Sequence, residues 1–237
     1  RALFSVPRKK TSVKPISSRI RQSVFDTLRP WVTGSIFLDL YAGTGASGLE
    51  ALSRGARKAV FVELDRFCVR VIERNVAHLG FGEQAVVVRG NVLSGLEWLK
   101  YHSHEGFDLV FMGPPYRDEE GLPLHYTSRT LELAAAGNIL SPGGFIVAQH
   151  HKKEPVAAPP GYEIARQAKY GDTLVSFAAM AQLAPALFGA VLWRGGHAHG
   201  ALAGMTVGMA VWIVMLALPQ LAPGAPWHLH VMLGVKD

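Results

Sequence analysis

The sequence predicts an α/β fold in which a mostly parallel sheet is covered on both faces by helices. Short apolar runs alternate with stretches of helical spacing from residue 36 to residue 149. Such continuous apolar strands are typical of parallel sheets that are buried on both faces. Two further β-rich runs flank Tyr170-Gly171-Asp172 and predict an antiparallel hairpin that closes the sheet.

The expected elements follow one another in regular order. Apolar residues at helical spacing predict a helix over residues 16–28, which Pro30 is expected to end. The expected strands are 36–40, 59–62, 85–88, 107–112 and 144–149. The helices expected between them are 46–54, 66–79, 93–101 and 128–136. The closing hairpin is expected over 162–168 and 173–178.

Charge divides the 237 residues into three parts, although the formal net charge is only +6. Residues 1–29 carry eight Lys and Arg against Asp26, residues 30–172 are close to neutral, and residues 173–237 hold three charged side chains. We therefore predict a basic N-terminal arm and helix (1–29), a central domain (30–179) and an apolar tail (180–237). A basic arm favours a polyanion such as nucleic acid, and a solvated flexible end is the alternative.

The tail has the composition of membrane-embedded helices. Two apolar runs, 178–193 and 201–218, flank a loop that holds Arg194, and the second run has the length needed to cross a bilayer. This pattern predicts a two-helix membrane hairpin, with membrane contact through residues 180–218. A buried helical hairpin of a soluble fold is the alternative. No metal is predicted, because the pairs His197/His199 and His228/His230 lack acidic or cysteine partners.

A single cysteine, Cys68, excludes a disulfide scaffold and fits a reducing compartment. We therefore expect a cytoplasmic protein, whose tail is the one part expected at a membrane.

A glycine loop follows the first expected strand. Its spacing is Gly43-x-Gly45-x-x-Gly48, and Glu63 lies 20 residues after Gly43, at the end of the second strand. Glycines let the backbone approach a ligand closely, and an acidic side chain there can accept hydrogen bonds from ribose hydroxyls. The loop indicates an adenosine-type cofactor and leaves NAD and S-adenosylmethionine open.

Two features favour S-adenosylmethionine over NAD, and hence methyl transfer over hydride transfer. Asp39 precedes the loop, where a carboxylate suits the ammonium end of methionine better than a pyrophosphate. Gly113-Pro114-Pro115-Tyr116 follows the fourth strand, at the edge where open α/β sheets bind ligands. Carbonyl acceptors and an aromatic ring at that edge suit methylation of an exocyclic amino group on a nucleobase.

The sequence resembles the RsmD-type methyltransferases, which modify the N2 of one guanine in bacterial 16S ribosomal RNA. The resemblance covers about residues 2–179. It is carried by the run from Lys14 to Phe25, the loop that begins at Asp39, and by Glu63-Leu-Asp-Arg, Pro114-Pro-Tyr and Tyr170-Gly-Asp-Thr. It implies a Rossmann-like class I fold with a seven-stranded, mostly parallel sheet, S-adenosylmethionine as cofactor, and small-subunit ribosomal RNA of the assembling 30S particle as partner. No protein partner is predicted.

The resemblance also assigns roles to residues. Asp39 and the loop from Gly43 to Gly45 would hold the methionine moiety, Glu63 the ribose, and Asn91 would lie beside the adenine. The full expected cofactor set is Asp39, Tyr41, Gly43, Thr44, Gly45, Glu63, Leu64, Asn91 and Val92. The guanine would be held by Gly113, Pro114, Pro115 and Tyr116. The RNA phosphates would meet Arg8, Lys9, Lys10, Lys14, Arg19 and Arg21.

Two features depart from that family. Its members carry Asp or Asn where this chain has Gly113, which removes a side-chain acceptor for the target amine. The alternative function is therefore a catalytically weakened protein that still binds S-adenosylmethionine and RNA. The tail resembles a piece of a sodium/solute symporter, which indicates a fusion to a membrane-transporter fragment, a rearrangement or an assembly artefact.

Overall fold

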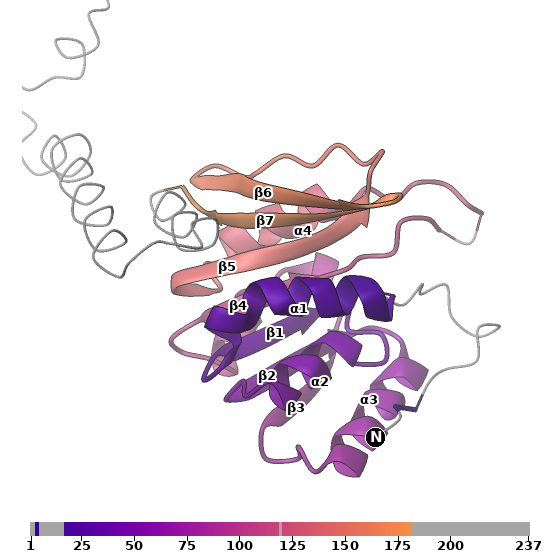
Figure 1. The fold of residues 1–237 in the computed structure, drawn as a ribbon. Coiled ribbons are helices and arrows are strands. Elements are labelled where there is room, and N and C mark those ends of the chain that lie inside the picture. The colour runs from indigo at the N-terminus through magenta and orange to yellow at the C-terminus, as the bar shows by residue number, and fades with distance from the viewer. Residues whose placement is uncertain (1–2, 5–16, 119, 182–237) are drawn as a thin grey trace, which may run out of the picture. The chain divides into compact units, whose positions relative to one another are not determined.

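The structure, a computed structural model, describes residues 3–4, 17–118 and 120–181 (Figure 1). It contains one seven-stranded sheet. The strand order is β3-β2-β1-β4-β5-β7-β6. The strands are β1 Ile36–Leu40, β2 Lys58–Glu63, β3 Ala85–Arg89, β4 Phe107–Met112, β5 Leu140–His151, β6 Tyr162–Tyr170 and β7 Thr173–Met180. Strands β1 to β5 run parallel, and β7 pairs antiparallel with both β5 and β6. The predicted sheet and its closing hairpin are confirmed.

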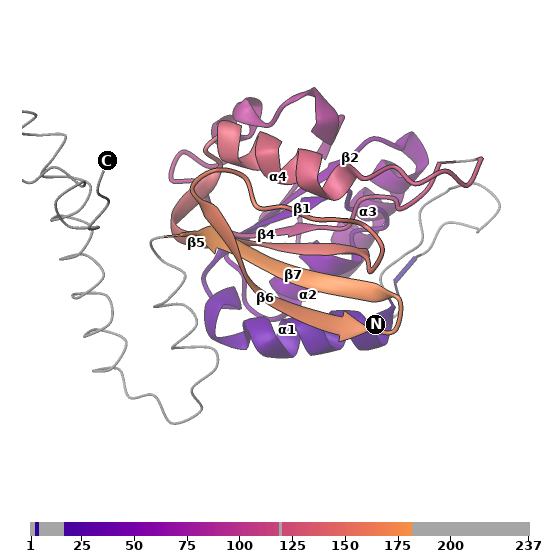
Figure 2. The same ribbon diagram turned by 90° about the horizontal axis from the view of Figure 1, so that it is seen from above.

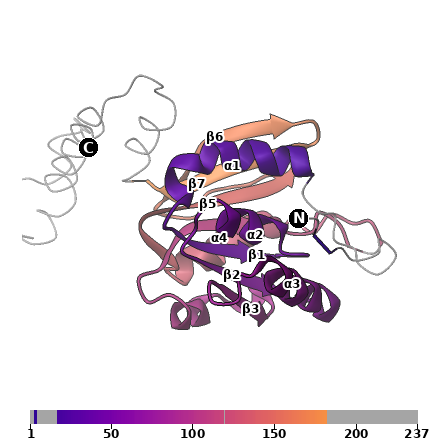
Figure 3. The same cartoon turned by 60° about the horizontal axis from the view of Figure 1, so that its bottom comes forward.

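Helices cover both faces of this sheet. Helices α1 (Ser18–Val32), α2 (Ala46–Ser53) and α3 (Arg66–Leu79) lie on one face (Figures 1 and 3). Helix α4 (Tyr126–Ala136) lies on the other (Figure 2), where it contacts the short 3-10 helix η2 (Val92–Ser94). Alternate side chains of one strand therefore enter two different core layers.

Each core layer is built from buried apolar side chains. On the α1 side, Phe37 of β1 stacks on Phe25 of α1, with ring centroids 5.8 Å apart. On the α4 side, Leu38 and Met112 belong to a cluster that also contains Leu131 of α4. All five side chains are at most 1% exposed.

The largest differences from the expected helices are the end of α1 and the form of the segment 93–101. Helix α1 continues through Pro30 to Val32, because the missing N–H affects only the last turn. That turn is held by Trp31, which packs edge-on against Phe145 of β5 at 5.6 Å. The expected helix over 93–101 is two 3-10 helices, η2 and η3 (Glu97–Tyr101), since Gly95 at φ 104° interrupts it.

The chain divides into two units, Arg1–Met180 and Ala181–Asp237. Only Ala181 of the second unit is described, so the predicted membrane hairpin and the two histidine pairs of the tail lie outside the described residues. Within the described ranges, no helix combines the length and the apolar character that crossing a membrane requires.

Candidate functional site

The glycine loop connects β1 to α2, and its three glycines are required for two steric reasons. Gly43 and Gly45 have φ values of 57° and 80°, which L side chains rarely adopt. A Cβ on Gly48 would lie 2.2 Å from Cε1 of the buried Phe61 ring in β2. The first two glycines therefore shape the loop, and the third lets α2 pack closely on the sheet.

Two buried carboxylates hold the two ends of this loop. Glu63 Oε2 accepts a hydrogen bond from the Gly43 N–H at 2.7 Å, and Asp39 Oδ2 accepts one from the Gly48 N–H at 2.8 Å. The second oxygen of Glu63 accepts from the Asp65 N–H at 2.8 Å. The loop is thus fixed by side chains of β1 and β2 at the carboxyl edge of the sheet.

Burial raises the pKa of both acids. It raises the pKa of Asp39 to about 8; the nearby Glu63 carboxylate raises that pKa further, while the hydrogen bond from Gly48 lowers it. Burial also raises the pKa of Glu63, against the hydrogen bonds from Asp65 and Gly43. A cationic or hydroxyl-rich ligand at this edge would favour the ionised forms.

These groups fit S-adenosylmethionine. Asp39 offers a carboxylate to an ammonium group. Glu63 keeps about one acceptor position for a ribose hydroxyl, because a carboxylate accepts about four hydrogen bonds and the N–H groups of Gly43, Asp65 and Leu64 supply three. Leu64 follows Glu63 and is 56% exposed, so it offers an apolar contact to a base. When bound, the cofactor supplies a methyl group activated by its sulfonium.

The other expected cofactor residues surround the same edge. Asn91 caps η2 by accepting from the Leu93 N–H at 3.0 Å, and Val92 is buried below it. Tyr41 has a φ of 59°, and its hydroxyl pairs with the Thr130 hydroxyl of α4 at 2.8 Å. Burial raises the pKa of Tyr41 to about 12, so this phenol is a fixed neutral group.

Sequence reasoning missed Asn75, which ties the loop to the start of the chain. Its Nδ2 donates to the carbonyls of Thr44 and Phe4, both at 3.2 Å, and its Oδ1 accepts from the Phe4 N–H at 2.7 Å. Asn75 is fully buried. The sequence did offer one signal for this residue, because Asn75 falls on the apolar face of the helix predicted over residues 66–79.

The proposed base-binding segment leaves β4 beside the cofactor loop, because β4 is the neighbour of β1. Gly113 is followed by Pro114, Pro115 and Tyr116, and the Tyr116 carbonyl accepts from the Leu124 N–H at 3.2 Å. The Tyr116 hydroxyl accepts from Gln149 Nε2 of β5 at 2.7 Å. Gln149 is a second residue that sequence reasoning missed.

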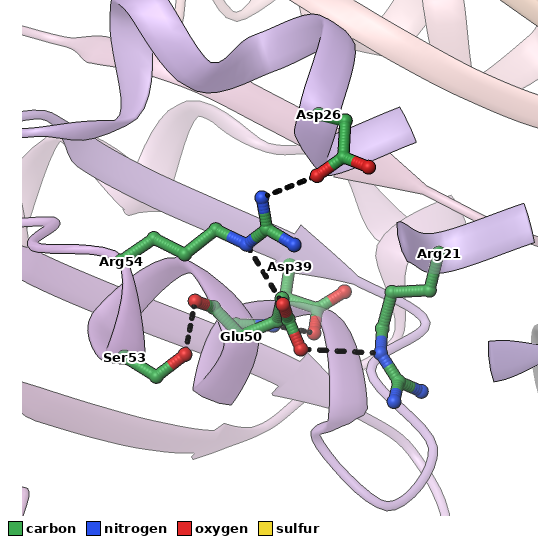
Figure 4. Close-up of polar contacts among 7 residues, drawn as sticks. Arg21, Asp26, Asp39, Glu50, Ser53 and Arg54 are labelled. Carbon is green, nitrogen blue, oxygen red and sulfur yellow. Dashed lines mark hydrogen bonds and ion pairs between the residues drawn. The ribbon is translucent and has the colours of Figure 1, made fainter. Parts of the chain in front are cut away.

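The candidate RNA-binding residues divide between described and undescribed parts. Arg8, Lys9, Lys10 and Lys14 lie outside the described residues. Arg19 is exposed on α1, whereas Arg21 forms an ion pair with Glu50 of α2 at 3.5 Å (Figure 4). Glu50 is also bound by Arg54, which reaches Asp26 of α1 at 2.9 Å. Arg21 therefore helps to join α1 to α2.

The topology brings the expected residues of β1, β2, β3 and β4 to one edge, with a nucleotide-type loop, two carboxylates and a Pro-Pro-Tyr segment side by side. In the described part of the chain, no group of three His, Cys, Asp or Glu side chains is placed to hold a metal. This fold and site define a class I S-adenosylmethionine-dependent methyltransferase.

Comparison with known proteins agrees with that class. Residues 2–179 match the family described as Conserved hypothetical protein 95, and the chain belongs to it. The match ends before the tail, so it gives no support to the predicted symporter resemblance.

Three relatives illustrate the similarity. The chain is 29% identical over 160 residues to "Ribosomal RNA small subunit methyltransferase D" of Haemophilus influenzae, covering 67% of this chain and 79% of that protein. It is 30% identical over 167 residues to "Putative rRNA methyltransferase YlbH" of Bacillus subtilis, covering 70% and 87%. A solved structure of a hypothetical protein from Thermus thermophilus superposes with a TM-score of 0.59 at 32% identity, covering 75% and 92%. These relatives support the RsmD-type resemblance over the α/β domain.

Proposed function

We propose that this chain transfers the methyl group of S-adenosylmethionine to the exocyclic N2 of a guanine in small-subunit ribosomal RNA. The observation that carries the proposal is the Gly113–Tyr116 segment beside the glycine loop, at the carboxyl edge of β4 and β1. The relatives named as ribosomal RNA methyltransferases support the RNA class.

The chain's own groups would act by positioning. The carbonyls of Gly113 and Pro114 would accept hydrogen bonds from the guanine amine, and the Tyr116 ring would stack on the base. Asp39 and Glu63 would hold the other substrate through its ammonium and ribose groups. Holding the amine in line with the methyl carbon supplies much of the rate, because it replaces a bimolecular encounter.

The test is methyl transfer to defined RNA. Small subunits from a methyltransferase-deficient strain would be incubated with the full chain and tritiated S-adenosylmethionine. We expect N2-methylguanosine at one site, identified by mass spectrometry of nuclease fragments. Label on a large subunit only, or on another base, would contradict the proposal.

A catalytically weakened binder is the second candidate, and Gly113 favours it. Losing one well-placed polar group in an active site lowers the rate by roughly 10²–10³. A Cβ on Gly113 would meet its nearest neighbours, Phe111 and Gln149, at 3.7 and 4.0 Å, so the position accepts a side chain. If this candidate is right, Gly113→Asp transfers methyl groups roughly 10²–10³ times faster than the native chain. Equal rates in the two chains exclude this candidate.

We place the reaction on the assembling 30S particle in the cytoplasm, with the basic arm on RNA phosphates. Charge supports the contact of the arm with RNA, because residues 1–29 carry eight Lys and Arg against one Asp. Replacing Lys9, Lys10 and Lys14 by Gln should weaken RNA binding. The slope of log affinity against log salt concentration should become shallower by about three. An unchanged slope in filter-binding assays would show that the arm does not contact the RNA phosphates.

A further inference from the structure

One buried polar group next to the proposed guanine site lacks a partner. Among the described residues, only two buried side-chain oxygens or nitrogens have no hydrogen bond, and one is Gln149 Oε1. Gln149 is 8% exposed. An unpaired buried acceptor destabilises a fold by about 1–3 kcal/mol, so its presence calls for a physical reason.

The position of this group relates it to Gly113. Met112, the last residue of β4, pairs with Ala148 of β5, so Gly113 directly follows β4 beside Gln149. A Cβ built on Gly113 would lie 4.0 Å from Cβ of Gln149. The amide of Gln149 therefore lies where a longer side chain at position 113 would reach.

The partner of the amide is also part of the proposed site. Nε2 of Gln149 donates to the Tyr116 hydroxyl at 2.7 Å, which turns the amide so that Oε1 is the free end. In this arrangement the oxygen is buried.

We propose that Gln149 supplies the side-chain acceptor that Gly113 lacks, with Oε1 accepting a hydrogen bond from the N2 amino group of the target guanine. This inference rests on the proposed function. The bond orients the N2 lone pair toward the methyl carbon. The nitrogen–carbon bond forms as the carbon–sulfur bond breaks, the electron pair stays on sulfur, and the displaced N2 proton passes to solvent water.

The experiment compares single-turnover methyl transfer in the full chain and its variants. Gln149→Leu removes the acceptor, and we expect a rate loss of roughly 10²-fold with little change in S-adenosylmethionine affinity. Gln149→Glu keeps an acceptor at the same place and should stay within about tenfold of the native rate. The double variant Gly113→Asp/Gln149→Leu should regain at least about tenfold, because the introduced carboxylate restores an acceptor from the neighbouring strand.

Thr127→Val is the matched control. Thr127 Oγ1 is the other buried atom without a partner among the described residues, and it lies on α4. This variant should leave transfer unchanged, which separates the role of Gln149 from a general effect of buried unpaired oxygens. Thermal unfolding of each variant shows whether a rate loss reflects loss of the fold.

The outcomes separate the two proposals. Three results would overturn the role of Gln149. The first is a native rate in Gln149→Leu, and the second is a rate loss that Gly113→Asp does not restore. The third is transfer by Gly113→Asp but none by the native chain. If neither the native chain nor Gly113→Asp methylates a guanine, the proposed function itself fails.

Discussion

At the scale of single residues, two buried carboxylates hold the glycine loop of the candidate site. Asp39 and Glu63 each accept a backbone N–H of the glycine loop, and burial raises the pKa of both. The sequence predicted them as cofactor ligands from their position at the ends of β1 and β2. It did not predict their structural bonds, because those depend on how the loop folds back over the strand ends.

Asp39→Asn should stabilise the free protein near pH 8. The pKa of Asp39 is raised from 3.8 to about 8, so the folded chain keeps a proton that the unfolded chain loses. Stability therefore falls as the pH rises from about 4 toward 8. Asn stays neutral and can still accept from Gly48, so we expect a gain of about 1–2 kcal/mol at pH 8, or roughly 2–8 °C in Tm, and almost none at pH 4.

The same variant should bind S-adenosylmethionine roughly 10–100-fold more weakly, since a charge-assisted hydrogen bond is lost. Calorimetric titration at pH 8 measures this loss. A variant that is more stable but binds with native affinity would show that Asp39 holds only the loop.

At the scale of elements, the close packing of α2 on β2 depends on Gly48. An added methyl group would lie 2.2 Å from the Phe61 ring, which is fully buried. Gly48→Ala should therefore destabilise the protein by about 1–3 kcal/mol, measured as a lower midpoint in urea. Gly82→Ala is the control, because a Cβ there meets no atom within 4 Å, and its midpoint should stay close to native.

The predicted elements agree best where local pattern alone decides them. Strands β1 and β4 and helix α3 match their predicted bounds, because the strands are short apolar runs and the helix has apolar residues at helical spacing that end at Gly80. Strand β5 begins at Leu140 rather than at the predicted Gly144. Its early start depends on a close backbone approach, since a Cβ on Gly144 would lie 2.5 Å from the Phe107 carbonyl oxygen. Sequence periodicity carries no information on such a contact.

The link between the chain start and the cofactor loop is a contact between distant elements. Asn75→Ala removes three hydrogen bonds that join α3 to Phe4 and Thr44. We expect the Phe4 amide to exchange its hydrogen faster. The affinity for S-adenosylmethionine should fall several-fold, because ligand binding to the variant must order a glycine loop that has lost its bond at Thr44.

Phe4→Ala is the comparison for this variant. It keeps the backbone bonds but removes the ring that lies 3.8 Å from the Arg74 guanidinium carbon. If Phe4→Ala lowers cofactor affinity as much as Asn75→Ala does, the effect comes from docking of the chain start and not from the Thr44 contact.

At the scale of the whole molecule, the family match and the division into units end at almost the same residue. The family match ends at residue 179, and the division into two units falls after Met180. All expected cofactor and guanine residues lie within β1 to β4 or the segments that follow them. Strand β7, which lies between β5 and β6, completes the sheet at Met180.

A chain shortened to residues 1–180 should therefore bind S-adenosylmethionine and transfer methyl groups at the rate of the full chain, within about twofold. The physical reason is that the described core is closed by β6 and β7 and takes its buried side chains from residues before Ala181. Flotation of both forms with lipid vesicles tests the tail separately, because the predicted membrane hairpin gives binding of the full chain only. A shortened chain that aggregates, or that loses cofactor binding, would show that residues after Met180 stabilise the catalytic domain.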